Sequence, residues 1–181
     1  MEDTYIRKIL AGDPEAFRYF LKKYQDMAFH VAVSIVKDSY YAEEVVQDAF
    51  MKAFRGLKSF NQKAKFKTWF YRIVINESFQ RLRKNKREKV SYAPAEEILV
   101  LERNPLFLSE EEEQKELIAH ALNQLAPKES LVLGLFYLDD YSLDEICNIT
   151  GWSLSNTKVI LHRARKNIRT MLGSTIKSSN E

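Results

Sequence analysis

Apolar residues recur at steps of three and four along most of this chain, which is the spacing of the buried face of an amphipathic helix. In the first half this pattern predicts four helices, over residues 4–11, 13–37, 39–57 and from 66 into the stretch 81–89. Asp13 followed by Pro14 is a typical helix start, because Asp accepts from free backbone amides and Pro fits the first turn. Ser39 is the expected cap of the third helix.

The pattern lapses over residues 90–108, where Pro94 and Pro105 interrupt an acidic stretch. Helical spacing resumes at Ser109, and three further helices are predicted over residues 128–138, 142–150 and 153–172. The tail from Gly173 is expected to fray. We therefore predict an all-α protein of two small helical domains, residues 1–89 and 109–181, joined by a flexible linker and ending in a helix-turn-helix.

Residues 142–165 have helix-turn-helix spacing, with Gly151 placed to form the left-handed turn between the two helices. The second helix is predicted to bury Leu154, Thr157, Leu161, Ala164 and Ile168. Its opposite face carries short polar groups near the N-terminus, where base edges are read, and then cations suited to phosphates. That face consists of Ser155, Asn156, Lys158, Val159, His162, Arg163 and Lys166. An ordinary helical hairpin with a solvated basic face would show the same pattern.

The net charge of +3 conceals an uneven distribution. Residues 1–90 hold 19 Lys and Arg against 11 Asp and Glu, whereas residues 91–115 hold 2 against 7. The excess lies in Lys63–Lys89, with 10 basic and 2 acidic residues, among which Phe66, Trp69, Phe70, Tyr71 and Phe79 are interleaved. Cations that hold a backbone beside rings that stack on bases suit single-stranded nucleic acid. The spacing of Phe66 and Phe70 also fits a helix core.

Several other functions find no support in the sequence. His30, His120 and His162 are far apart, and there is no CxxC, HExxH, paired carboxylate or Gly-rich phosphate loop, so we expect no enzyme, metal or cofactor. The single cysteine, Cys147, and the lack of a long apolar run predict a cytoplasmic protein without membrane insertion. A stand-alone repressor or activator would leave the first ninety residues unexplained, and the basic stretches argue against an interaction protein that binds no DNA.

Several stretches, in order, resemble the bacterial sigma factors of the extracytoplasmic-function (ECF) group. They are Gly12–Phe17, Ala42–Phe54, Phe66–Asn76 and the helix-turn-helix with His162–Arg165, and the likeness covers about residues 4–88 and 110–172. The resemblance implies a non-enzymatic transcription initiation factor that binds core RNA polymerase and directs it to promoters. It further implies that the C-terminal helix-turn-helix reads the −35 element, that the N-terminal domain opens the −10 element, and that an anti-sigma factor is a partner.

The resemblance, with the exposed face described above, assigns residues to three surfaces. Contacts to core polymerase are expected from Glu44, Gln47, Asp48 and Lys52. Contacts to the melted −10 strand are expected from Lys65, Lys67, Thr68, Trp69, Arg72 and Asn76. Contacts to the duplex −35 element are expected from Ser155, Asn156, Lys158, His162, Arg163, Arg165 and Lys166. Three positions depart from the family's pattern: Ser130 and Ile160 stand where Arg is frequent, and Ala126 precedes Pro127 where Leu is usual.

Overall fold

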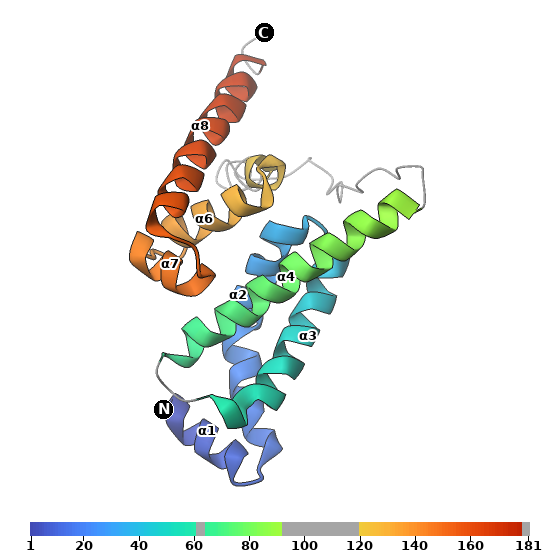
Figure 1. The fold of residues 1–181 in the computed structure, drawn as a ribbon, viewed down its shortest axis with the longest axis vertical. Coiled ribbons are helices and arrows are strands. Elements are labelled where there is room, and N and C mark those ends of the chain that lie inside the picture. Colours follow the sequence, from blue (N-terminus) through green and yellow to red (C-terminus); the bar gives the residue numbers. More distant parts are fainter. Residues whose placement is uncertain (61–63, 92–119, 179–181) are drawn as a thin grey trace, which may run out of the picture. The chain divides into compact units, whose positions relative to one another are not determined.

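A computed structural model describes residues 1–60, 64–91 and 120–178, and in these ranges the chain forms helices and connecting turns without a strand. It divides into two compact units, one built mainly from residues 1–85 and the other mainly from the helices after residue 120 (Figure 1). The predicted all-α, two-domain architecture is confirmed. The predicted linker lies outside the described residues, apart from its first two positions. No helix within the described ranges is both long enough and apolar enough to cross a membrane.

The first unit is built around an aromatic core that joins three helices. Its elements are α1 (Glu2–Leu10), a 3-10 turn (Pro14–Phe17), α2 (Arg18–Val36), α3 (Ser39–Gly56), a second 3-10 turn (Leu57–Ser59) and α4 (Phe66–Ser91). Phe20 of α2 lies 4.1 Å from Phe66 of α4 between ring centroids, and Phe50 of α3 lies 4.6 Å from Phe70. All four rings are buried. Figure 1 shows α4 as one uninterrupted helix that continues into the basic stretch.

Of two helix caps predicted for this unit, one is confirmed and one is wrong. Asp13 caps as predicted, since its carboxylate accepts from the Glu15 N–H at 3.1 Å, but the turn it begins is a 3-10 turn and α2 starts only at Arg18. The expected cap of α3 is wrong by one residue. Asp38 accepts from the Tyr41 N–H at 3.0 Å, and Ser39 is the first helical residue. Both Asp and Ser can cap a helix, so the choice between neighbours depends on where the preceding helix ends.

The second unit contains α6 (Pro127–Tyr137), α7 (Leu143–Thr150) and α8 (Leu154–Ser178), and residues 120–124 are also helical. Leu125 and Leu133 pack with Ala164 of α8 in its core. α8 continues through Gly173 to Ser178, so the expected end at residue 172 is wrong. Glycine lowers helix stability, but it ends a helix only where the chain adopts the left-handed conformation.

Candidate nucleic-acid interface

Local side-chain contacts fix the turn between α7 and α8. Ser142 and Glu145 form a capping box at the start of α7: the Glu145 carboxylate accepts from the Ser142 N–H at 2.9 Å, and the Ser142 hydroxyl accepts from the Glu145 N–H at 3.3 Å. Gly151 has φ of 74°, as predicted for the turn. Ser153 then caps α8 by accepting from the Asn156 N–H at 3.3 Å. The capping box was not predicted, although the sequence carries its signal, Ser followed three residues later by Glu.

The buried side of α8 meets α7 through a small polar contact. Cys147 donates from Sγ to the Thr157 hydroxyl at 3.4 Å, and that hydroxyl donates to the Ser153 carbonyl at 3.0 Å. Thr157 is buried, as are Leu161 and Ala164. The predicted stripe is shifted slightly, because Leu154 is 40% exposed whereas Ile160 is 7% exposed. Ile160 is therefore a core residue in this chain.

The opposite side of α8 is exposed and carries positive charge. All seven residues predicted for it are exposed, namely Ser155, Asn156, Lys158, Val159, His162, Arg163 and Lys166. Within the described part of the chain, Lys158, Arg163 and Lys166 form no ion pair with a carboxylate. Their charges are thus available to a polyanion, next to polar groups in the first two turns of the helix. This arrangement suits a helix that enters the major groove.

Arg165 differs from these neighbours because its side chain contacts other residues of its own domain. Its Nε donates to the Tyr137 hydroxyl at 2.8 Å, and its guanidinium lies 5.3 Å from the Phe136 ring centroid and 5.5 Å from that of Tyr137. These contacts join α8 to the end of α6. Arg165 remains a predicted DNA contact, and the structure gives it a packing role as well.

The residues predicted for the melted strand gather at the start of α4. Lys65, Arg72 and Asn76 are exposed, and Lys67 and Thr68 are half-buried. Steps of three and four residues place Lys65, Arg72 and Asn76 on one side of the helix together with Trp69. Lys67 lies on another side of α4, where its Nζ is 5.7 Å from the Tyr71 ring centroid, so the six predicted residues do not share one face.

The Trp69 ring is partly occupied by packing within the domain. Its centroid lies 4.8 Å from Phe60 and 5.5 Å from Phe66. A Cβ placed on Gly56 would stand 3.3 Å from Cζ2 of this ring, so glycine at the end of α3 lets the indole approach the backbone closely. Gly56 was not among the predicted site residues, although a glycine ending a strongly patterned helix is a signal of close packing.

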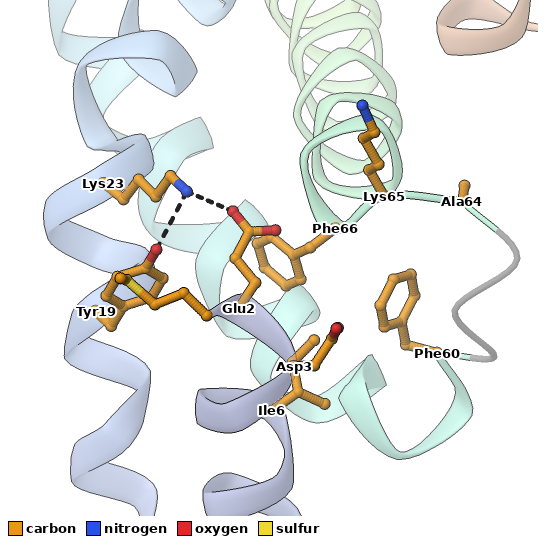
Figure 2. A pocket seen from close by; sticks show the side chains of 10 residues that line it. Glu2, Asp3, Ile6, Tyr19, Lys23, Phe60, Ala64, Lys65 and Phe66 are labelled. Atoms are coloured by element: carbon orange, nitrogen blue, oxygen red, sulfur yellow. Dashed lines mark hydrogen bonds and ion pairs between the residues drawn. The ribbon is translucent and has the colours of Figure 1, made fainter.

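A cavity of about 650 Å³ lies beside Lys65. Figure 2 shows Glu2 and Lys23 on one side of it and Phe60 and Lys65 on the other. Lys23 Nζ donates to Glu2 at 2.6 Å, and the Tyr24 hydroxyl also donates to Glu2. Partial burial by itself raises the pKa of Glu2. The hydrogen bonds from Lys23 and Tyr24 and the positive charge of Lys23 lower this pKa by more than burial raises it, so the net shift is downward. This network fastens α1 to α2 along one wall of the cavity.

The four residues predicted to contact polymerase separate into two pairs on α3. Gln47 and Asp48 are exposed, and Asp48 forms no ion pair among the described residues. Glu44 instead pairs with Arg81 of α4 at 2.8 Å, and Lys52 pairs with Glu77 of α4 at 2.6 Å. The α4 partners are the more buried members, with side chains 19% and 11% exposed. Glu44 and Lys52 therefore connect α3 to α4.

The described ranges contain no group of three His, Cys, Asp or Glu side chains arranged to hold a metal ion. The chemistry available on these surfaces is that of charge, hydrogen bonding and ring stacking.

Comparisons with known proteins give matches over both units. Residues 20–88 match the family described as Sigma-70 region 2, and residues 115–168 match Sigma-70 region 4. The chain is 28% identical to the ECF RNA polymerase sigma factor SigW of Bacillus subtilis, covering 92% of this chain and 94% of that protein. It is 30% identical to the RNA polymerase sigma factor SigV of the same species, covering 80% and 83%. It is 28% identical to the ECF RNA polymerase sigma-E factor of Escherichia coli K12, covering 92% of each.

Solved structures show the same fold. The sigma factor RpoE of Bartonella quintana, in a co-crystal with the anti-sigma factor NepR, superposes with a TM-score of 0.70 at 24% identity, covering 87% of this chain and 96% of that one. CnrH, solved in complex with the cytosolic domain of CnrY, gives a TM-score of 0.65 at 20% identity, covering 94% and 96%.

Proposed function

Because this chain belongs to the ECF group of RNA polymerase sigma factors and is a promoter-directing transcription initiation factor, we propose that its surfaces divide that task among α3, α4 and α8. Residues 1–89 bind core polymerase and open the −10 element. Residues 109–181 read the −35 element, and residues 90–108 link the two.

The exposed face of α8 is the observation that carries this proposal. Its N-terminus is capped by Ser153, and its first turns present Ser155 and Asn156. Lys158 and Arg163 follow, and neither forms an ion pair with another described residue. Amide and hydroxyl groups can read base edges, whereas the cations displace counterions from phosphates. His162 and Lys166 extend the same face. A helix with this order of groups is suited to the duplex −35 element.

The start of α4 suits a strand whose bases have left the stack. Lys65, Lys67 and Arg72 supply cations, Thr68 and Asn76 supply hydrogen bonds, and Trp69 supplies a half-buried ring. Stacking on aromatic rings and cations along the backbone are the two general means of holding single strands. We assign the melted −10 strand to this surface.

On α3, the ion pairs distinguish direct contacts from supporting ones. Gln47 and Asp48 face solvent and are the main polymerase contacts in this proposal. Glu44 and Lys52 contribute their outer edges to the same surface while they hold α3 against α4. This gives the four predicted residues different expected effects when they are replaced.

The proposal extends to partners and place of action. The sigma factor RpoE of Bartonella quintana was solved with the anti-sigma factor NepR, and we propose a partner of this kind for the chain. It acts in the cytoplasm, where polymerase and DNA are found, and it catalyses no reaction of its own.

Run-off transcription tests the proposal. Core polymerase would be incubated with genomic DNA from the organism that encodes the chain, with and without the chain. We expect discrete new start sites that share an upstream element. The triple variant Lys158→Ala, Arg163→Ala, Lys166→Ala should still co-purify with core polymerase but lose those transcripts. If the variant gives the same transcripts as the parent, α8 does not hold the upstream DNA.

A further inference from the structure

One apolar side chain stands in the middle of the polar face of α8. Val159 is 46% exposed. Residues three and four positions apart are neighbours on a helix surface, and for Val159 these are the exposed residues Ser155, Asn156, His162 and Arg163. Val159 is thus enclosed by the groups that we assign to base edges and phosphates.

The folding of the domain does not account for this valine. The buried side of α8 is supplied by other residues, namely Thr157, Ile160, Leu161 and Ala164. Valine is also a weaker helix former than alanine, because its branched Cβ loses rotamer freedom against the preceding turn. Single exposed apolar residues are common on protein surfaces. Here, however, the residue lies on the face of α8 that carries Lys158, Arg163 and Lys166, where binding DNA would bury it.

We propose that Val159 is a specificity-determining residue whose methyl groups pack against the 5-methyl group of one thymine in the upstream promoter element. This inference rests on the proposed role of α8. Thymine is the only base that presents a methyl group in the major groove, and apolar side chains are the groups that contact it. Val159 is the sixth residue of α8, which begins at Leu154, so it belongs to the N-terminal turns that a recognition helix directs at base edges.

Deoxyuridine provides the test, because it pairs as thymidine does but lacks the 5-methyl group. The preferred upstream element would first be selected from a randomised pool with the full chain and core polymerase. Each thymine in it would then be replaced singly by deoxyuridine. At one position we expect the affinity of the parent complex to fall about fourfold, the factor for losing burial of one methyl group. Val159→Ala should lose a similar factor on thymine DNA and little more when uracil replaces that thymine, as a direct contact requires.

Lys158→Ala is the matched control, since it removes a neighbouring exposed side chain of α8. It should weaken binding to every sequence and keep the full uracil penalty. Circular dichroism should show that Val159→Ala folds and melts no lower than the parent, because alanine is the better helix former.

Two results would overturn the inference. One is a selected element without a preferred thymine, and the other is a uracil penalty that persists in full in Val159→Ala. A parent complex that shows no upstream preference at all would overturn the role of α8 itself, and with it this inference, so the two failures can be told apart.

Discussion

At the scale of single residues, two arginines of α8 are expected to differ in role, one binding DNA and the other packing within the domain. Arg163 is exposed and forms no ion pair in the described part of the chain, whereas Arg165 donates to Tyr137 and covers two rings. Arg163→Ala should weaken binding to all promoters alike and reduce the slope of log affinity against log salt by about one. Its unfolding midpoint should match that of the parent.

Arg165→Ala should instead lower the free energy of unfolding by about 1 kcal/mol, because a charge-assisted hydrogen bond and a cation–π contact are lost. Tyr137→Phe removes only the hydroxyl and should give a smaller loss in the same urea titration. Equal stability of Arg165→Ala and the parent would show that this guanidinium does not support the domain.

The residues of α3 allow a second prediction at this scale. Asp48→Arg should abolish co-purification with core polymerase and leave helix content unchanged, because Asp48 is exposed. Asp26→Arg is the control, since it makes the same charge reversal at an exposed position of α2. Glu44→Ala should lower stability, because Arg81 loses its carboxylate partner in a mostly buried position. Retention of polymerase by Asp48→Arg would contradict the surface assigned to α3.

At the scale of elements, the corner between α2 and α3 contains a strained residue. Lys37 ends α2 with φ of 60°, in the left-handed region that favours glycine, and burial lowers its pKa to about 8. Lys37→Gly should raise the free energy of unfolding at pH 7 by about 1 kcal/mol. Above pH 8 the unfolded chain, with an ordinary pKa of 10.5, holds a proton that the folded parent has released, so the parent gains stability as pH rises.

The difference in free energy of unfolding between Lys37→Gly and the parent should therefore decrease between pH 8 and 10.5. Urea titrations of both proteins across this range would measure it. An advantage that grows with pH would contradict a lowered pKa for Lys37.

The same elements show what the sequence could and could not reveal. Helical periodicity placed α2, α3, α7 and α8, because each buries a stripe that repeats every three to four residues. α6 was placed by Pro127 at its start instead, since its buried residues, Ser130, Leu131, Val132, Leu133 and Leu135, are too close together to form one stripe. The choice of Asp38 over Ser39 as cap, and the passage of α8 through Gly173, depend on backbone conformation that residue type alone does not determine.

Contacts between side chains on different helices could not be predicted from the sequence either. Glu44 and Lys52 look as exposed as Asp48 on a helical projection, and only the crossing of α4 brings Arg81 and Glu77 to them. Arg165 likewise meets Tyr137 from another helix, 28 positions away. The polar face of α8 was predictable because its exposure follows from the periodicity of a single element.

At the scale of the whole molecule, transcription from a promoter with a preformed bubble distinguishes the recruitment of polymerase from the opening of the DNA. The double variant Lys67→Ala, Asn76→Ala should bind core polymerase and reach the upstream element, but permanganate reactivity of thymines near the start site should fall sharply. Unstacking costs a few kcal/mol per base, which this surface offsets in our proposal. A mismatched bubble at the −10 element should restore much of the transcription.

Arg163→Ala serves as the control for this experiment, since its defect lies upstream and the bubble should not correct it. Normal opening of duplex promoters by the double variant, or no recovery on the bubble, would argue against a melting role for α4.

The two ion pairs between α3 and α4 have a consequence for how these helices align. They have opposite polarity: α3 contributes the acid in one, Glu44, and the base in the other, Lys52. If α4 slipped by one turn, Arg81 would move toward Lys52 or Glu77 toward Glu44, and like charges would meet in either direction. Opposite charges therefore face each other in only one register of α4 against α3. The helix that we assign to polymerase and the helix that we assign to the melted strand are thereby held in a fixed alignment.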